Sequence, residues 1–149
     1  MPGTPSNRRR FLQVVAHGSA IAGATSLGVA CSGGGPSGSY AAGNVSAFPV
    51  GSLQAISAGP VAVGHDSGGL YAMSLICTHA SCDMGLQGQV SSQGVFCSCH
   101  GSAFDVQGNP VSGPARSALE HYEVTVDATG AITVNADVPV AETTRTAIA

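Results

Sequence analysis

The chain has 149 residues, with five basic and eight acidic side chains, which is enough for one small core but not for two independent ones. From Cys31 onward two basic residues stand against eight acidic ones, a formal net charge of 2 − 8 = −6. This balance argues against nucleic acid as a binding partner, because binding its phosphates needs clustered Lys and Arg. It argues in the same way against a polybasic surface that binds membranes.

Residues 1–31 have the features of an export leader rather than of a folded element. Arginines at positions 8 to 10 precede a weakly apolar stretch rich in Ala and Gly, and small residues come before Cys31. Residues 7–12, "NRRRFL", resemble a twin-arginine signal. The alternative is a general secretory leader with extra arginines, and in either case we expect export.

Cys31 resembles the acceptor cysteine of bacterial lipoproteins, which makes it the candidate for a lipid anchor. Two alternatives stay open: cleavage just before an incidental cysteine, or retention of residues 11–30 as a short membrane helix. The Gly- and Ser-rich residues 32–43 predict a flexible linker. Residues 44–149 then form the single folded domain.

Short strands joined by tight turns are predicted for that domain, because Val, Thr, Ser and Gly dominate its second half. Residues 119–127 and 131–135 alternate well and predict a hairpin, with Tyr122 and Val124 on one face and His121 and Glu123 on the other. Further strands are expected at residues 45–50, 53–56, 60–66 and 70–77. The expected class is all-β, an antiparallel β-sandwich.

Two tight groups of metal-ligating side chains lie in the loop-rich residues 77–116. "CTHASC" begins at Cys77 and "CSCHGS" begins at Cys97, and one cysteine and one histidine from each give the spacing C-x-H-x17-C-x-x-H. Two thiolates and two imidazoles can hold one tetrahedral zinc, or the two irons of a [2Fe–2S] cluster. Two observations weigh against a structural zinc module: zinc fingers usually pair ligands separated by two to four residues, and a zinc site would leave Cys82 and Cys99 unexplained.

The two groups resemble the cluster-binding boxes of the Rieske iron–sulfur proteins, and the resemblance spans about residues 44–136. It implies a Rieske-type [2Fe–2S] cluster with one iron bound by two cysteines and the other by two histidines. The ligands that it implies are Cys77 and Cys97 for the first iron, and His79 and His100 for the second.

The same resemblance implies a disulfide between Cys82 and Cys99, as in the membrane-complex branch of the family. Gly113 and Pro114 resemble the proline loop that covers the cluster. The expected fold is therefore a small Rieske-type β-sandwich with a loop-rich cluster-binding subdomain at about residues 77–116.

Electron transfer is the function that the resemblance implies, with no catalysis by this domain alone. Two ferric ions, two sulfides and two thiolates sum to zero charge, whereas four thiolates would give −2, so histidine ligation raises the reduction potential. An imidazole can also exchange a proton, which makes quinols plausible donors. The expected role is the iron–sulfur subunit of a membrane quinol:cytochrome c oxidoreductase, with a cytochrome b-like subunit and a cytochrome c-like acceptor as partners.

The disulfide and the leader both indicate the compartment. Disulfides persist outside the cytoplasm and are rare inside it. Because iron–sulfur clusters are built in the cytoplasm, the protein must cross already folded, which twin-arginine export permits. We therefore expect a membrane-anchored protein on the periplasmic face of the bacterial cytoplasmic membrane.

Two residues of the first box, and the loop that follows it, depart from the quinol-oxidising members of the family. Ala80 replaces a larger apolar residue, Ser81 replaces the usual Gly, and the loop from Cys82 to Cys97 is short. The alternative function is a free-standing tethered redox module, or the small subunit of a periplasmic oxidoreductase such as arsenite oxidase.

Ser102 and Phe104 follow the second box, at positions where high-potential members carry Ser and Tyr. Those hydroxyls donate hydrogen bonds to sulfur and raise the potential. The chain keeps the serine and lacks the tyrosine, which predicts a lower potential. His65 and His121 lie at predicted strand ends, where we expect exposed polar residues rather than ligands.

Overall fold

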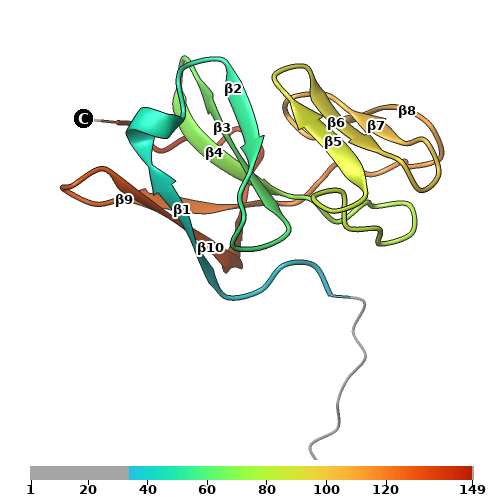
Figure 1. The fold of residues 1–149 in the computed structure, drawn as a ribbon, viewed down its shortest axis with the longest axis horizontal. Coiled ribbons are helices and arrows are strands. Elements are labelled where there is room, and N and C mark those ends of the chain that lie inside the picture. Colours follow the sequence, from blue (N-terminus) through green and yellow to red (C-terminus); the bar gives the residue numbers. More distant parts are fainter. Residues whose placement is uncertain (1–33, 149) are drawn as a thin grey trace, which may run out of the picture. The chain divides into compact units, whose positions relative to one another are not determined.

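The structure, a computed structural model, describes residues 34–148, which form two antiparallel sheets (Figure 1). A six-stranded large sheet has the order β1-β10-β9-β4-β3-β2, and a four-stranded small sheet has the order β5-β6-β7-β8. The strands are β1 (Ser39–Asn44), β2 (Ser52–Ala55), β3 (Val61–Asp66), β4 (Gly69–Ser74), β5 (Gly88–Ser91), β6 (Gly94–Cys97), β7 (Ala103–Phe104), β8 (Pro110–Ser112), β9 (His121–Val126) and β10 (Ala131–Val140). The predicted all-β antiparallel class is confirmed.

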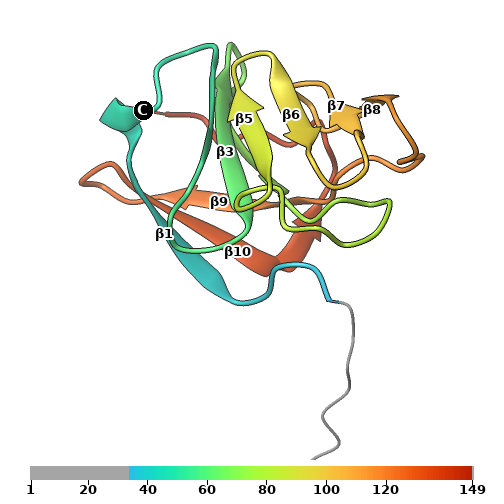
Figure 2. The same ribbon diagram turned by 45° about the vertical axis from the view of Figure 1, so that its right-hand side comes forward.

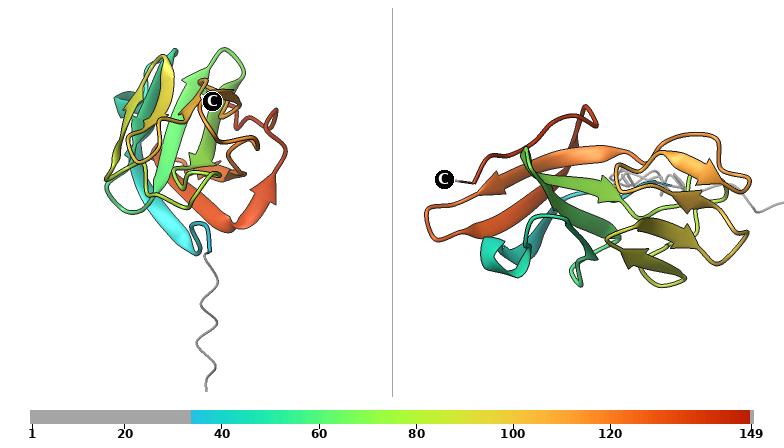
Figure 3. Two further views of the ribbon diagram at one scale, coloured as in Figure 1. Left: turned by 90° about the vertical axis from the view of Figure 1, so that its right-hand side faces the viewer. Right: turned by 90° about the horizontal axis from the view of Figure 1, so that it is seen from above.

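The β9–β10 hairpin forms where the alternation predicts it. Tyr122 and Val124 of β9 are buried in one core together with Ile132 and Val134 of β10. The Asp127 carboxylate closes the turn between the strands by accepting hydrogen bonds from backbone N–H groups. This turn lies at the opposite end of the described unit from the small sheet (Figures 1 and 3).

Strand β4 is buried along its whole length because it lies between two cores. Leu70 and Ala72 face the core of the large sheet, whereas Tyr71 and Met73 face a second core between the two sheets. Alternation along a strand sends successive side chains to opposite faces, so a strand covered on both faces has no polar face to show.

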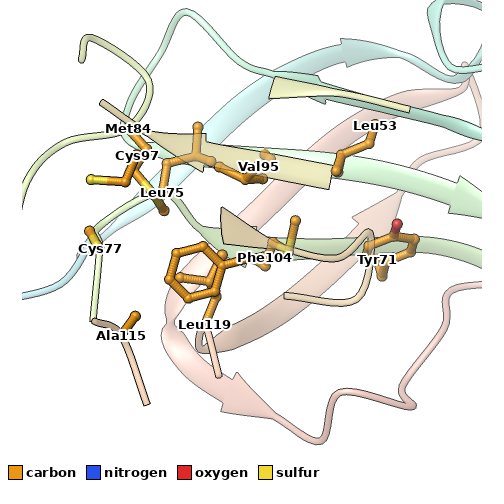
Figure 4. Close-up of a cluster of buried hydrophobic side chains, with 12 residues drawn as sticks. Leu53, Tyr71, Leu75, Cys77, Met84, Val95, Cys97, Phe104, Ala115 and Leu119 are labelled. Carbon is orange, nitrogen blue, oxygen red and sulfur yellow. The ribbon is translucent and has the colours of Figure 1, made fainter. Parts of the chain in front are cut away.

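The core between the sheets places the small sheet against β2, β3 and β4 (Figures 2 and 4). Its buried side chains come from both sheets and from the loops around them. They are Leu53, Ala62, Tyr71, Met73, Leu75, Cys77, Met84, Val95, Cys97, Phe104, Ala115 and Leu119. Both cysteines that begin the sequence boxes therefore lie in this core.

Two expectations near the start of the domain are wrong. Residues 45–47, expected in a strand, form a 3-10 helix that begins after Asn44, whose side chain accepts the Ser46 N–H. Residues 39–43, expected in the linker, belong to β1 and pair with β10. Small residues such as Ala41 and Gly43 suit a flexible linker by composition, but β10 supplies a pairing edge that composition does not reveal.

The expected exposure of His121 is also wrong, because its side chain is 3% exposed. The start of β9 pairs with β4, where Met73 stands opposite His121. The alternation predicts that the His121 face of β9 is exposed to solvent. At the start of the strand this face is covered by the core between the sheets. His65 is half-buried, and its Nδ1 lies 2.6 Å from the Phe48 carbonyl oxygen.

The residues after β10 return to the large sheet. Thr146 forms an isolated antiparallel bridge with Leu70 of β4. In residues 34–148 we find no helix with the length and apolar character needed to cross a membrane.

Candidate metal centre

The first box is a tight loop closed at its base by backbone hydrogen bonds. The Cys77 N–H donates to the Cys82 carbonyl at 2.8 Å, and the Ser81 N–H donates to the Cys77 carbonyl at 2.9 Å. Cys77 is therefore held at the base of the loop, where it is buried, while His79 lies at the exposed tip.

The second box repeats this geometry with different residues. The Cys97 N–H donates to the Ser102 carbonyl at 2.8 Å, and the Gly101 N–H donates to the Cys97 carbonyl at 3.0 Å. Cys97 is fully buried and His100 is exposed. Each box thus buries its first cysteine and exposes its histidine.

The fifth residue of each loop takes a left-handed backbone conformation. Gly101 has φ +78°, and Ser81, which is at the matching place, has φ +56°. Ser81 is the only non-glycine residue with positive φ in the part of the chain that the structure describes. This backbone requirement explains why glycine is usual at this position, and residue type alone does not show it.

The loops bring the two histidines together. The ring centroids of His79 and His100 are 4.9 Å apart, and the ring planes are 78° from parallel. Both side chains are exposed. Two imidazoles from loops that begin 20 residues apart, 97 − 77, therefore face one small volume at the surface.

The two buried thiols lie close enough to influence each other. Burial raises the pKa of the Cys97 thiol, and the neighbouring Cys77 thiol raises it further. Backbone N–H groups of Cys99 and His100 favour the Cys97 thiolate without offsetting the effect of burial. A bound cation would compensate this cost by replacing the thiol protons.

Cys82 and Cys99 form a disulfide that joins the two boxes, with Cα atoms 6.7 Å apart. This is the pair that the resemblance implies. The Sγ atoms of Cys82, Cys97 and Cys99 lie within 4.8 Å of one another. Because the disulfide occupies two of them, this group offers one free thiol and is not a metal site by itself.

Residues 113–115 cover the second box. The Ala115 N–H donates to the Ser102 hydroxyl at 3.1 Å, and Ser102 is fully buried. Gly113 has φ +85°, and a Cβ there would lie 2.5 Å from the Ser102 Cα. Pro114 is exposed.

The first box is also linked to the residues that follow the covering segment, which the sequence did not predict. The Thr78 hydroxyl donates a hydrogen bond to the Ser117 carbonyl at 2.7 Å.

Phe104 belongs to the same core as Cys77 and Cys97 and is 2% exposed (Figure 4). Its place in this core agrees with a role beside the metal centre, which stays a prediction. The twin-arginine motif and Cys31 lie outside the described residues.

The donor set fits a histidine-ligated iron–sulfur cluster. The two loops supply two buried thiols and, at the surface, two adjacent imidazoles, and a disulfide fixes the loops to each other. Thiolates and imidazoles are the ligands used by such clusters. The disulfide also accounts for the two cysteines that a zinc site would leave over.

The family model of the Rieske [2Fe-2S] domain matches residues 39–123, more than half of the chain. Among curated proteins, the cytochrome bc1 complex Rieske iron-sulfur subunit of Corynebacterium diphtheriae is 43% identical over 65 residues. This match covers 42% of the chain and 16% of the relative, so the chain spans a minor part of that protein.

The cytochrome b6-f complex iron-sulfur subunit of a Synechococcus species is 36% identical over 64 residues, which are 43% of the chain and 35% of that subunit. Among solved structures, the plasma membrane Rieske protein of Synechocystis PCC 6803 aligns with a TM-score of 0.48 and 29% identity. That alignment covers 64% of the chain and 98% of the solved structure.

Proposed function

The chain belongs to the Rieske [2Fe-2S] family, carries this cluster and transfers electrons, and we propose that four residues of the two boxes hold the cluster and that it works in a membrane cytochrome bc-type complex. The ligand assignment rests on the two matching loops. The proposed ligands are Cys77, His79, Cys97 and His100. When bound, the cluster supplies a one-electron carrier with a potential raised by histidine ligation.

The buried cysteines and exposed histidines have different proposed tasks. Cys77 and Cys97 hold their ligand atoms away from water, in the core between the sheets. His79 and His100 stand at the surface, where the ring nitrogen that does not bind metal can exchange a proton with solvent or with a donor. A donor that releases an electron and a proton together, such as a quinol, suits this arrangement.

We assign the domain to the iron–sulfur subunit of a membrane cytochrome bc-type complex, accepting electrons from quinol and passing them to a cytochrome c-like protein. Named subunits of bc1 and b6-f complexes are among its relatives, which supports cytochrome partners in general. The twin-arginine leader and the lipid anchor at Cys31 are part of this proposal and would hold the domain on the periplasmic face.

The cluster content of the full-length protein, extracted from membranes, tests the ligand assignment. We expect two irons and two acid-labile sulfides per chain, and Cys97→Ser or His100→Ala should abolish the signal of the reduced cluster in electron paramagnetic resonance. Ser98→Ala is the matched control, because Ser98 is an exposed residue of the same box. One zinc without labile sulfide would overturn the assignment.

A free-standing redox module with a protein donor is the second candidate, and the small side chain of Ala80 favours it. Ala80 is exposed at the tip of the first box, beside His79. Reduction of the cluster in membranes by added quinol separates the candidates. A cluster that only a protein donor can reduce would support the second.

A further inference from the structure

Residues 142–146, here called the return segment, are fixed to the edge of the β3–β4 hairpin. Leu70 and Thr146 exchange two backbone hydrogen bonds, of 2.9 and 2.8 Å. The Thr146 hydroxyl also donates to the Val124 carbonyl at 2.6 Å. Gly69 has φ +129°, and a Cβ there would overlap the Thr146 carbonyl. The chain therefore has a glycine where the return segment passes.

Arg145 extends from this segment to both sheets. Its Nε donates to the Asp66 carboxylate at the end of β3 at 2.7 Å, and its Nη2 donates to the Gln107 side chain in the loop between β7 and β8. Its Nη1 donates to the carbonyls of Glu142 and Thr144, which fixes the guanidinium within its own segment. The Arg145 side chain is 15% exposed.

Tyr71 makes a second tie to the same loop. Its hydroxyl donates to the Val106 carbonyl at 2.7 Å. The Arg145 guanidinium lies over the Tyr71 ring, 4.3 Å from its centroid, in a cation–π contact. Two successive residues of the small sheet's loop are therefore held: Arg145 binds Gln107 directly, and Tyr71, on whose ring Arg145 packs, binds Val106.

The charge on Asp66 is stabilised by the same contact. Burial would raise the pKa of its carboxyl group, but hydrogen bonds from Arg145 and Gly68 and the positive charge of Arg145 lower the pKa overall. Among residues 34–148 this is the only ion pair, and it joins segments 79 residues apart. Such a pair is directional because the planar guanidinium fixes several donors at once.

The held loop leads directly to the metal centre. It follows β7, whose Phe104 packs in the core that contains both free cysteines. On its other side, the Leu119 N–H donates to the Gly108 carbonyl at 2.9 Å, and Leu119 enters that core as well. Movement of this loop would therefore shift the side chains packed beside the second box.

We propose that Arg145 is a positioning residue, which holds the β7–β8 loop on the large sheet and thereby fixes the second box at the metal centre. The link to electron transfer rests on the proposed function, whereas the link between Arg145 and the loop does not. The sequence alone assigned no role to Arg145.

Hydrogen exchange in the full-length protein tests the hold on the loop. The Gln107 and Asn109 N–H groups donate to Asp105 within the loop, so their exchange reports its opening. Arg145→Gln should speed this exchange about tenfold, the effect of losing one charged contact. Gln107→Ala removes the side chain through which the loop binds Arg145 and leaves the Arg145–Asp66 ion pair in place, and it should speed the exchange of the Asn109 N–H by a similar factor. The double variant should exchange no faster than Arg145→Gln.

Two controls separate position from charge. Arg116→Gln removes the same charge from the other basic residue of the described chain, which is exposed, and should leave exchange in the loop unchanged. Arg145→Lys keeps the charge but lacks the planar guanidinium with its several donors, so exchange in the loop should be slower than in Arg145→Gln and still faster than in the parent. Unchanged exchange in Arg145→Gln, or equal acceleration by Arg116→Gln, would overturn the proposal.

The state of the metal centre is measured in the same samples by two properties of the cluster. Arg145→Gln and Gln107→Ala should broaden the electron paramagnetic resonance spectrum of the reduced cluster and speed iron loss to a chelator about tenfold, in line with the faster opening. If both properties stayed at parental values while exchange rose, the claim about the second box would be wrong. A parent protein without labile sulfide would contradict the proposed function, and exchange in the loop would still decide the role of Arg145.

Discussion

Ser102 and Phe104 are separated by one residue in the sequence, and only the serine carries a hydroxyl group that can donate a hydrogen bond. The Ser102 hydroxyl oxygen accepts the Ala115 N–H, so its own proton remains free for an acceptor such as sulfur. The Phe104 ring has no polar atom, although it is buried in the core of the free cysteines. One of two potential donors beside the cluster is therefore absent.

Restoring that donor should raise the reduction potential. A hydrogen bond to a charged acceptor contributes about 1 to 2 kcal/mol, which for one electron is roughly 40 to 90 mV. We expect Phe104→Tyr to raise the midpoint potential at pH 7 by about this amount and Ser102→Ala to lower it by a comparable amount, both measured by protein-film voltammetry. Phe96→Tyr, which adds a hydroxyl on an exposed ring of β6, is the control.

An unchanged or lowered potential in Phe104→Tyr would mean that residue 104 does not face a ligand sulfur. Ser102→Ala needs a separate check, because it also leaves the Ala115 N–H without its acceptor. A shift in potential with unchanged thermal stability would assign the effect of Ser102 to the sulfur.

Among the elements around the metal centre, the covering segment depends on Gly113. A Cβ at Gly113 would meet the backbone of Gly101 and Ser102, which cannot move aside without opening the second box. Gly113→Ala should therefore destabilise the protein by about 2 to 4 kcal/mol through overpacking and backbone strain. Chemical denaturation of the oxidised protein measures the change.

Gly101→Ala is the matched control for this prediction. Gly101 has a similar φ, +78° against +85° for Gly113, but no atom lies within 4 Å of the place where its Cβ would be. It should lose about 1 kcal/mol from backbone strain alone. Equal losses in the two variants would show that the close approach of the covering segment does not matter.

The disulfide joins the two boxes across 17 residues. Replacing Cys82 and Cys99 by serine should reduce the free energy of unfolding by about 3 kcal/mol, because the unfolded chain regains the entropy of an open loop of this length. Differential scanning calorimetry of the double variant measures this loss. The cluster content should fall with it, and a variant with parental stability would mean that the strands alone hold the boxes together.

Local patterns predicted those elements that a single local signal specifies. The β9–β10 hairpin followed from alternation and a turn, and the two boxes followed from residue types and spacing. The 3-10 helix after Asn44 was missed because capping by one side chain competes with an apolar pattern that also suits a strand. The burial of His121 and the contacts of Arg145 depend on a second layer that no local pattern contains.

For the molecule as a whole, the burial of His121 makes stability depend on pH. Burial lowers the pKa of this histidine and the nearby charge of Arg145 lowers it further, whereas a hydrogen bond with the Leu119 backbone and the charge of Glu142 act in the opposite direction without offsetting the effect of burial. Its ring centroid is 6.1 Å from that of Tyr71, and its Nε2 has no hydrogen-bond partner among the described residues. The folded protein therefore keeps His121 neutral where the unfolded chain takes up a proton.

The sign follows from proton uptake. The unfolded chain binds the proton near pH 6.5, so the contribution of neutral His121 is complete above about pH 6.5 and is lost as the pH falls toward the lower pKa of the folded state. We expect the difference in unfolding free energy between the parent and His121→Leu to shift in favour of the variant between pH 7.5 and pH 5. Urea denaturation at the two pH values measures this difference, and a difference that does not change with pH would contradict the prediction.

The pairing order of the strands also bears on self-association. The small sheet ends at β8, a strand of three residues that begins with Pro110, and Pro cannot donate a backbone hydrogen bond to an added strand. At one edge of the large sheet, β1 carries an irregularity in its register between Ala41 and Gly43. Short, interrupted edges of this kind oppose the strand-by-strand joining of copies that leads to fibres. The β1 and β8 edges can therefore be exposed at high local concentration without acting as templates for aggregation.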